Sequence, residues 1–163
     1  YSQPGLGTTF SIYLPRHTGK DREALPGERE APVPHGSETI LLAEDEPVIL
    51  EMTARMLEHL GYTVLMAGTP GEAIRKAKEH PGALHLLITD VIMPEMNGRD
   101  LAHHIRLTNP DVRCVFMSGY TDDIIAHQGV LDEGVFFIQK PFSLGSLAEK
   151  VRQALGKKMI QDS

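Results

Sequence analysis

Hydrophobic residues follow two different spacings between residue 39 and residue 155. Short, continuously apolar runs of strand length lie at 40–43, 62–67, 84–89, 112–117 and 135–138. Segments in which apolar residues recur at helical spacing lie between and after these runs, at 47–60, 70–79, 98–108, 121–128 and 143–155. Five consecutive strand–helix units of this kind predict an α/β fold, an open parallel sheet with helices on both faces.

The first 37 residues do not continue this pattern. Residues 8–14 alternate, with Phe10, Ile12 and Leu14 on one face, as in a half-buried strand. A lone strand has no partner with which to fold. Residues 15–37 carry four prolines among alternating charges, which is typical of a linker. We therefore expect a terminal strand remnant at 1–15, a linker at 16–37, one domain at 38–157 and a short tail at 158–163.

Composition and charge narrow the class of protein. The 163 residues are 41% hydrophobic and 23% charged, as in an ordinary globular domain. The net charge of −6 disfavours non-specific binding to nucleic acid or to an anionic membrane. The single cysteine, Cys114, cannot form an internal disulfide, and no apolar stretch reaches the roughly 18 residues of a membrane span. We expect a cytoplasmic location, and the lack of a signal sequence at Tyr1 suggests a piece of a longer chain.

Charged and polar residues lie just beyond the ends of the apolar runs. Glu44 and Asp45 follow the first run, Asp90 the third, Ser118 the fourth and Lys140 the fifth. Because the carboxyl ends of parallel strands share one edge of a sheet, we expect these side chains to line one crevice. Carboxylates ~4 Å apart repel by about 4 kcal/mol per pair at an effective dielectric near 20, and they need a counter-charge. Mg²⁺ or Mn²⁺, which bind carboxylate oxygens, would supply it.

The same crevice holds the parts of a phosphoryl-transfer site. With a metal on Asp45 and Asp90, a free carboxylate oxygen of Asp90 can attack phosphorus and form an aspartyl phosphate. Lys140 and the metal would neutralise the equatorial oxygens during the transfer. Ser118 could donate a hydrogen bond to another phosphoryl oxygen. This chemistry predicts a phosphoryl acceptor.

Four segments also carry a resemblance to a known family. Residues 38–47 (ETILLAEDEP), 89–98 (TDVIMPEMNG), 117–119 (MSG) and 139–142 (QKPF) together resemble a response-regulator receiver domain, over about residues 38–157. The resemblance implies a flavodoxin-like sheet with strand order 2-1-3-4-5. It also implies a bacterial two-component phosphorelay, in which a histidine-phosphorylated kinase or phosphotransfer domain is the donor.

The resemblance further assigns the metal ligands and the phosphoacceptor. Asp90 would accept the phosphoryl group. Asp45, Asp90 and the backbone carbonyl of Ile92 would bind Mg²⁺ directly, with Glu44 acting through water. No ATP site is expected, because the chain lacks the asparagine-bearing ATP motif and the phosphoaccepting histidine pattern of histidine kinases.

The family switch would involve Ser118 and Phe137, and the bond between Lys140 and Pro141 would be cis. Phenylalanine at 137 differs from the frequent tyrosine, because it offers no hydroxyl to a loop carbonyl. Ile92 and Tyr120 would flank the phosphoryl group, and both lack a carboxylate or amide that could orient water. We therefore expect slow self-dephosphorylation.

A second resemblance concerns the N-terminus. Residues 1–15 (YSQPGLGTTFSIYLP) are similar to the closing strand of a histidine-kinase ATPase domain. Together the two resemblances predict the C-terminal part of a hybrid sensor histidine kinase, whose enzymatic activity would belong to the parent protein. The surface around the fourth helical segment and the fifth run, with Ile124, Ile125 and Phe142, is expected to pair two copies or to dock a partner.

Other interpretations stay open from the residues. A stand-alone single-domain response regulator would share all four segments. An aspartate-nucleophile phosphatase would use similar metal chemistry, but it usually carries a second acid two residues after the nucleophile, where this chain has Ile92. A pure interaction module would be expected to lack one of Asp45, Asp90 and Lys140, which are all present. Asp45 alone, just before Pro47, is equally consistent with a helix cap.

Several residues have simpler explanations. Gly5 and Gly7 are expected to form a turn before a strand, and Cys114 to be a small core residue. The adjacent His103 and His104 point to different sides of a helix and are expected on the surface. One residue of the Phe136–Phe137 pair should face the core and the other the switch side, and the pattern leaves open which is which.

Overall fold

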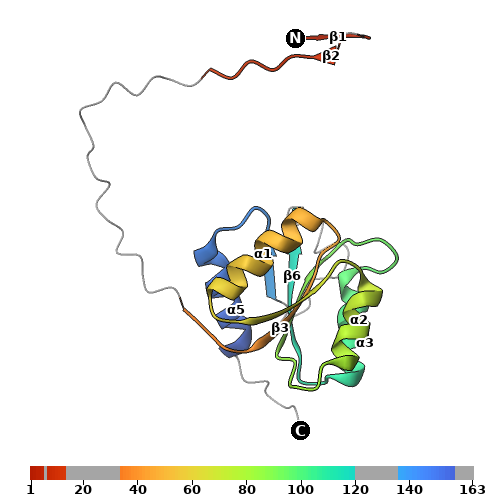
Figure 1. Ribbon diagram of the computed structural model, residues 1–163, viewed down its shortest axis with the longest axis vertical. Helices are drawn as coiled ribbons and strands as arrows, with labels where there is room; N and C mark the ends of the chain where they lie inside the picture. Colours follow the sequence, from red (N-terminus) through yellow and green to blue (C-terminus); the bar gives the residue numbers. More distant parts are fainter. Residues whose placement is uncertain (6, 14–33, 120–135, 157–163) are drawn as a thin grey trace, which may run out of the picture. The chain divides into compact units, whose positions relative to one another are not determined.

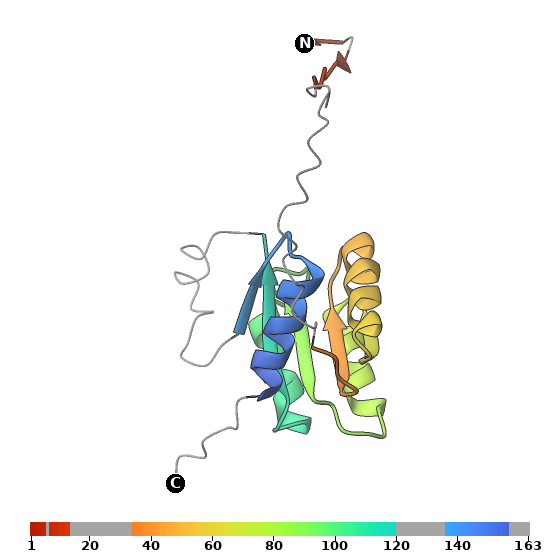
Figure 2. The ribbon, with the colours of Figure 1, turned by 90° about the vertical axis from the view of Figure 1, so that its left-hand side faces the viewer.

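The computed structural model describes residues 1–5, 7–13, 34–119 and 136–156 (Figures 1 and 2). The chain divides into two units, Tyr1–Ala31 and Pro32–Ser163. Within the described ranges, no helix combines the length and the apolar character that a membrane span requires. The predictions that fall outside these ranges are helix 121–128, the tail at 158–163, Tyr120, Ile124 and Ile125.

A five-stranded parallel sheet forms the centre of the second unit (Figure 1). The strands lie in the order β4-β3-β5-β6-β7. Counted from the first strand of this unit, that is the predicted order 2-1-3-4-5, and the flavodoxin-like prediction is confirmed. The strands are β3 (Thr39–Ala43), β4 (Thr63–Ala67), β5 (Leu86–Asp90), β6 (Arg113–Ser118) and β7 (Phe136–Gln139).

Helices cover both faces of this sheet, as predicted (Figures 1 and 2). One face packs against α1 and α5, and the other packs against α2 and α3. Successive residues of β3 alternate between these two cores, with Leu42 on the α1–α5 side and Leu41 on the α2–α3 side. Both leucines are fully buried, which explains why the run is continuously apolar. The helices are α1 (Pro47–His59), α2 (Pro70–Glu79), α3 (Gly98–Thr108) and α5 (Leu144–Gly156).

Local signals in the sequence account for the helix ends. Pro47 starts α1, and Gly61 follows its last turn with φ +92°, where its N–H donates to Glu58 O. The side chain of Thr69 caps α2, and the side chain of Asn97 caps α3. Similarly, Ser143 Oγ accepts from the N–H of Ser146, so Ser143 precedes α5 rather than opening it.

The two phenylalanines of β7 face opposite sides of the sheet. Phe136 packs against the α1–α5 core, and Phe137 packs against the α2–α3 core. Cys114 is a buried core residue, as predicted, and burial raises the pKa of its thiol to about 12. His103 and His104 lie on the exposed side of α3, which confirms their surface position.

The N-terminal unit corrects one prediction. Its strands are β1 (Ser2–Gln3) and β2 (Gly7–Thr8), which pair as an antiparallel hairpin. The expected turn includes Gly5, with φ +78°, whereas Gly7, with φ +88°, is the first residue of β2. The strand predicted at 8–14 is absent from the described residues 9–13, where Phe10 is 87% and Ile12 is 84% exposed. Residues 9–13 alternate in polarity, but within the part of the chain that the structure describes their apolar side chains do not pack on a sheet.

Candidate functional site

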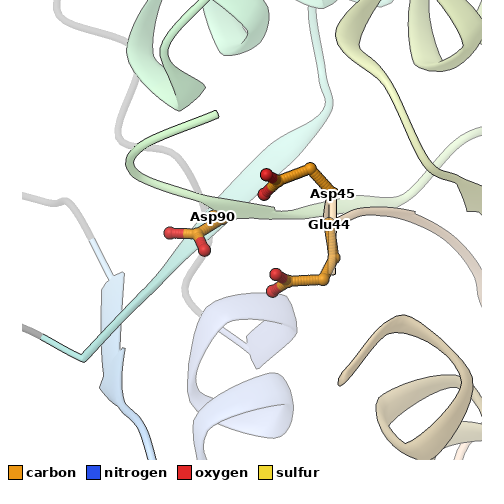
Figure 3. A group of neighbouring side chains, drawn as sticks. All are labelled: Glu44, Asp45 and Asp90. Carbon is orange, nitrogen blue, oxygen red and sulfur yellow. The ribbon is translucent and has the colours of Figure 1, made fainter. Parts of the chain in front are cut away.

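Three carboxylates meet at the edge of the sheet where β3 and β5 end (Figure 3). Glu44 and Asp45 directly follow β3, and Asp90 is the last residue of β5. One carboxylate oxygen from each of the three lies within 4.8 Å of the others. Because β3 and β5 are neighbouring parallel strands, their ends bring together residues that are 45 positions apart.

The three carboxylates differ in their access to solvent. Glu44 is 1% exposed, the side chain of Asp90 is 17% exposed, and Asp45 is exposed. Asp45 does not cap α1, because the N-cap residue is Glu46 and no side chain caps that end. The cluster is therefore open on the side of Asp45 and closed on the side of Glu44.

Lys140 points into this cluster, as predicted. Its Nζ donates to Glu44 Oε2 at 2.5 Å and to Asp90 Oδ2 at 2.7 Å. The lysine follows β7, and its backbone N–H donates to Ser118 O at the end of β6. The bond between Lys140 and Pro141 is cis, as the family resemblance implied. The ammonium group of Lys140 thus contacts two of the three carboxylates, Glu44 and Asp90.

The electrostatics of the cluster follow from burial and from this cation. Burial raises the pKa of Glu44, and the hydrogen bond from Lys140 offsets that effect in part. Burial opposes the charge on Lys140, but hydrogen bonds to Asp90 and Glu44 outweigh it and raise its pKa. We infer that Lys140 stays charged and that the pocket keeps an excess of negative charge on its open side, at Asp45 and Asp90.

The backbone around Asp90 is held from several directions. Asp90 Oδ1 accepts from the N–H of Ile92 at 3.2 Å, and Thr89 Oγ1 donates to Asp90 O at 3.0 Å. Val91 N–H donates to Met117 O, and Gly98 N–H donates to Val91 O. These contacts fix the end of β5 before the chain turns toward α3.

Gly98 is a site-shaping residue that the sequence did not single out. A Cβ built at this position would overlap Asp90 O and approach Thr89 Cγ2 at 3.1 Å. In the sequence Gly98 is only the last residue of the segment 89–98 and the first residue of the predicted helix 98–108. Its proximity to the Asp90 carbonyl depends on how the loop folds back, and no local pattern encodes that.

The remaining predicted residues lie around the cluster. Ser118 ends β6 and is 2% exposed. Ile92 is 50% exposed, two residues after Asp90. Phe137 is half-buried on β7, on the α2–α3 side of the sheet. Ser118 and Phe137 lie on adjacent strands, in which Phe116 pairs with Phe137 and Ser118 with Gln139.

The residues present fit a hard divalent cation. The three acidic side chains offer only oxygen donors, and their oxygens are close enough for one ion to contact more than one of them. Lys140 alone does not neutralise the three carboxylates, since it contacts Glu44 and Asp90 but is not paired with Asp45. Mg²⁺ and Mn²⁺ both match this donor set.

Comparisons with known proteins agree with the fold and show the family. A family model described as "Response regulator receiver domain" matches residues 40–152. The chain is 39% identical to the sensor kinase CckA of Brucella abortus, over 96% of this chain and 17% of that protein. It is 30% identical to the response regulator receiver protein CpdR of the same organism, over 71% of this chain and 95% of that protein.

Solved structures give the same result. The receiver domain of a hybrid histidine kinase CckA superimposes with a TM-score of 0.61 and 38% identity, over 72% of this chain and 98% of that one. A response regulator receiver protein from Sinorhizobium medicae superimposes with a TM-score of 0.64 and 29% identity, over 74% and 95% of the two chains. The chain spans less than a fifth of the length of the sensor kinase that it resembles.

Proposed function

This chain belongs to the response regulator receiver family of two-component phosphorelays, and we propose that its Asp90 is the phosphoryl acceptor. The observation that carries the proposal is the convergence of Asp90 with Glu44, Asp45 and Lys140 at one edge of the sheet. Asp90 is the member of the cluster that is both partly accessible to solvent and in contact with Lys140.

The proposed donor is a phosphohistidine on a kinase or a phosphotransfer domain. A carboxylate oxygen of Asp90 attacks phosphorus and forms a P–O bond, while the P–N bond to the imidazole breaks. The electron pair of that bond returns to the imidazole nitrogen. The backbone contacts at Ile92, Thr89 and Gly98 hold the attacking group in one orientation, which lowers the entropic cost of the reaction.

The metal part of the proposal concerns the open side of the cluster. Asp45, Asp90 and the carbonyl of Ile92 would hold Mg²⁺ or Mn²⁺ directly, and Glu44 would contribute through water. The bound ion would neutralise charge on the phosphoryl oxygens. The charged Lys140 would contact another of these oxygens, after it leaves Glu44 and Asp90.

The switch part of the proposal concerns Ser118 and Phe137. The hydroxyl of Ser118, at the end of β6, would donate to the phosphoryl group. Phe137 would then change its packing on the neighbouring strand. Support comes from the positions of Ser118 and Phe137 on the adjacent strands β6 and β7. The hydrogen bond from Lys140 N–H to Ser118 O links the ends of these two strands.

The central test uses Asp90→Asn. This change keeps the size of the side chain and removes the nucleophile, so acid-labile phosphate from a phosphohistidine donor should fall to background. Asp111→Asn, on an exposed loop residue, is the matched control and should be labelled like the parent protein. Stoichiometric labelling of the Asp90→Asn protein, at a site other than a neighbouring hydroxyl, would contradict the assignment.

We propose further that the chain is the C-terminal part of a hybrid sensor histidine kinase that works in the cytoplasm. The alignment with the sensor kinase covers 96% of the chain, so it extends upstream of the matched receiver residues 40–152. The division at 1–15, 16–37, 38–157 and 158–163 belongs to this proposal. The coding sequence upstream of Tyr1 tests it, because an open reading frame without an ATPase domain would contradict it.

A further inference from the structure

A second cluster lies at the end of the sheet opposite to Asp90. It consists of Gly36, Glu38, Tyr62 and Arg152, and we call it the linker clamp. Arg152 Nε donates to the hydroxyl of Tyr62 at 2.7 Å, and the guanidinium lies 5.2 Å from the centroid of the same ring. Arg152 Nη2 forms an ion pair with Glu38 Oε2 at 2.6 Å. Arg152 therefore connects α5 to the residues that precede β3 and β4.

Gly36 fits into this cluster because it has no side chain. Its N–H donates to Leu60 O at 3.0 Å. A Cβ at Gly36 would overlap Glu38 Oε2 and Tyr62 Cε1 and would lie 2.5 Å from Arg152 Nη2. Gly61 has φ +92°, and a Cβ there would lie 2.5 Å from Gly36 O. Two glycines thus permit a close approach between the end of the predicted linker and the turn after α1.

Burial and charge act in opposite directions on Arg152 in the linker clamp. Tyr62 is 4% exposed, and burial raises the pKa of its hydroxyl despite the hydrogen bond from Arg152. Burial opposes the charge on Arg152, but its contacts with Glu38 and Tyr62 outweigh that effect and raise its pKa. Glu38 and Arg152 keep 26% and 31% of their side chains exposed, so their ion pair is partly screened. The close packing of Gly36 and the hydrogen bond to the Tyr62 hydroxyl also hold the clamp together.

Two contacts, at opposite ends of β3, link that strand to α5 and to the residues just before α5. The start of β3 is next to Glu38, and its end is followed by Glu44. Arg152 lies within α5, which begins four residues after Lys140. The contact between Lys140 and Glu44 joins the residues just before α5 to the end of β3. The contact between Arg152 and Glu38 joins α5 itself to the start of β3.

We propose that the linker clamp docks residues 34–38 onto the receiver and that phosphorylation of Asp90 loosens it. This inference rests on the proposed function, in which Lys140 leaves Glu44 to contact the phosphoryl group. Loss of that contact lets α5 shift relative to β3, and this shift weakens the ion pair between Arg152 and Glu38. The state of Asp90 thereby reaches the chain that precedes the receiver. Because coupling is reciprocal, weakening the clamp should favour the phosphorylated state.

Amide hydrogen exchange at Gly36 measures the clamp directly in the full 163-residue chain. Loading with beryllofluoride and Mg²⁺, a stable substitute for the phosphoryl group, should speed exchange at Gly36 about tenfold. In the unloaded protein, Arg152→Gln and the milder Tyr62→Phe should also speed it, by about tenfold and about threefold. Both variants should bind beryllofluoride more tightly, Arg152→Gln by about threefold and Tyr62→Phe by less, because the coupling is reciprocal.

Arg55→Gln is the matched control. It alters a highly exposed arginine that pairs with Glu51 on α1, so exchange and affinity should stay unchanged. Unchanged exchange at Gly36 in both Arg152→Gln and Tyr62→Phe would overturn the clamp itself. Loading of Asp90 without any change at Gly36 would overturn the coupling and leave the proposed function intact. Failure of the parent protein to load would overturn the proposed function and the coupling together, and the unloaded variants would still decide the clamp.

Discussion

Each oxygen of the Asp90 carboxylate has a separate partner. Oδ1 accepts from the backbone N–H of Ile92, and Oδ2 accepts from Lys140. In the proposed reaction one of these oxygens must form a bond to phosphorus. A lysine side chain can rearrange more readily than a backbone N–H that is fixed within a tight loop, so Lys140 is the partner that we expect to move. In the proposed reaction the loop would hold the Asp90 carboxylate in place, and Lys140 would release one of its oxygens.

The side chain of Ile92 leads to a prediction about the lifetime of the aspartyl phosphate. Ile92 is 50% exposed beside Asp90 and has no group that could orient a water molecule toward phosphorus. We expect slow self-dephosphorylation, and Ile92→Asn should speed the loss of phosphate roughly tenfold because an amide can hydrogen-bond water. The measurement follows acid-labile phosphate with time after loading from a small phosphodonor.

Leu107→Asn provides the control for that experiment. Leu107 is an exposed apolar residue on α3, 70% exposed and 17 positions from Asp90 in the sequence, and its substitution should leave the decay unchanged. A half-life of seconds in the parent protein would contradict the prediction. Equal decay in the parent protein and in Ile92→Asn would show that this position does not limit hydrolysis.

At the scale of elements, the loop between β5 and α3 is the part that shapes the site. Glu95 adopts φ +70°, and the N–H of Met96 donates to Pro94 O, which makes a tight turn of an uncommon kind. The loop then closes on itself through the bond from Gly98 N–H to Val91 O. This closure brings the start of α3 against the carbonyl of Asp90, where only a glycine fits.

Gly98→Ala should therefore affect the site as well as stability. The new methyl group would overlap the Asp90 carbonyl, so the end of β5 or the start of α3 must move. We expect a loss of about 1–3 kcal/mol in the free energy of unfolding, and a roughly tenfold slower phosphorylation of the protein that remains folded. Chemical denaturation and phosphotransfer kinetics measure the two effects.

Gly71→Ala is a matched control for that substitution. Gly71 lies in the first turn of α2, and a Cβ there would have no neighbour within 4 Å. It should keep the parent phosphorylation rate and should gain up to about 1 kcal/mol in stability, because alanine is the better helix former. A Gly98→Ala protein that phosphorylates at the parent rate would show that the close contact does not position Asp90.

At the scale of the whole molecule, the fold gathers three acidic side chains of the described residues where β3 and β5 end. The parallel arrangement brings Glu44, Asp45 and Asp90 together, and the chain as a whole carries a net charge of −6. Lys140 pairs with two of these acids. Repulsion at this edge opposes folding, so any cation that binds the folded cluster should stabilise the entire domain.

Mg²⁺ should accordingly raise the melting temperature of the unphosphorylated protein. At about 100 times its dissociation constant, a ligand specific for the folded state adds about 2.7 kcal/mol. Asp45→Asn removes one carboxylate from the open side, so it should stabilise the metal-free protein and abolish most of the gain from Mg²⁺. Thermal unfolding with and without Mg²⁺ measures both effects. An equal Mg²⁺ gain in Asp45→Asn and in the exposed control Asp111→Asn would contradict a site at this cluster.

Much of this organisation could be predicted from local patterns. The five apolar runs match the five strands to within two residues at each end, and the helices 70–79 and 98–108 have the predicted bounds. Strand ends locate Glu44, Asp45 and Asp90 without any knowledge of contacts, because parallel strands share an edge. The strand prediction at residues 8–14 was wrong for the described residues 9–13, because a polarity pattern does not show whether a neighbouring strand is present. Alternation indicates a strand only where a sheet is available to receive it.

The sequence therefore specified the type and order of the elements that the structure describes between Thr39 and Gly156, and with them the edge at which the acidic residues meet. Only the tertiary structure decided that Lys140 pairs with Glu44 and Asp90 within that crevice, and that Gly98 lies against the carbonyl of Asp90. It also brought Gly36, which the composition assigned to the linker, into contact with Tyr62 and Arg152. The physical reason is that helix and strand patterns depend on near neighbours in the chain, whereas these contacts depend on how whole elements pack against one another in space.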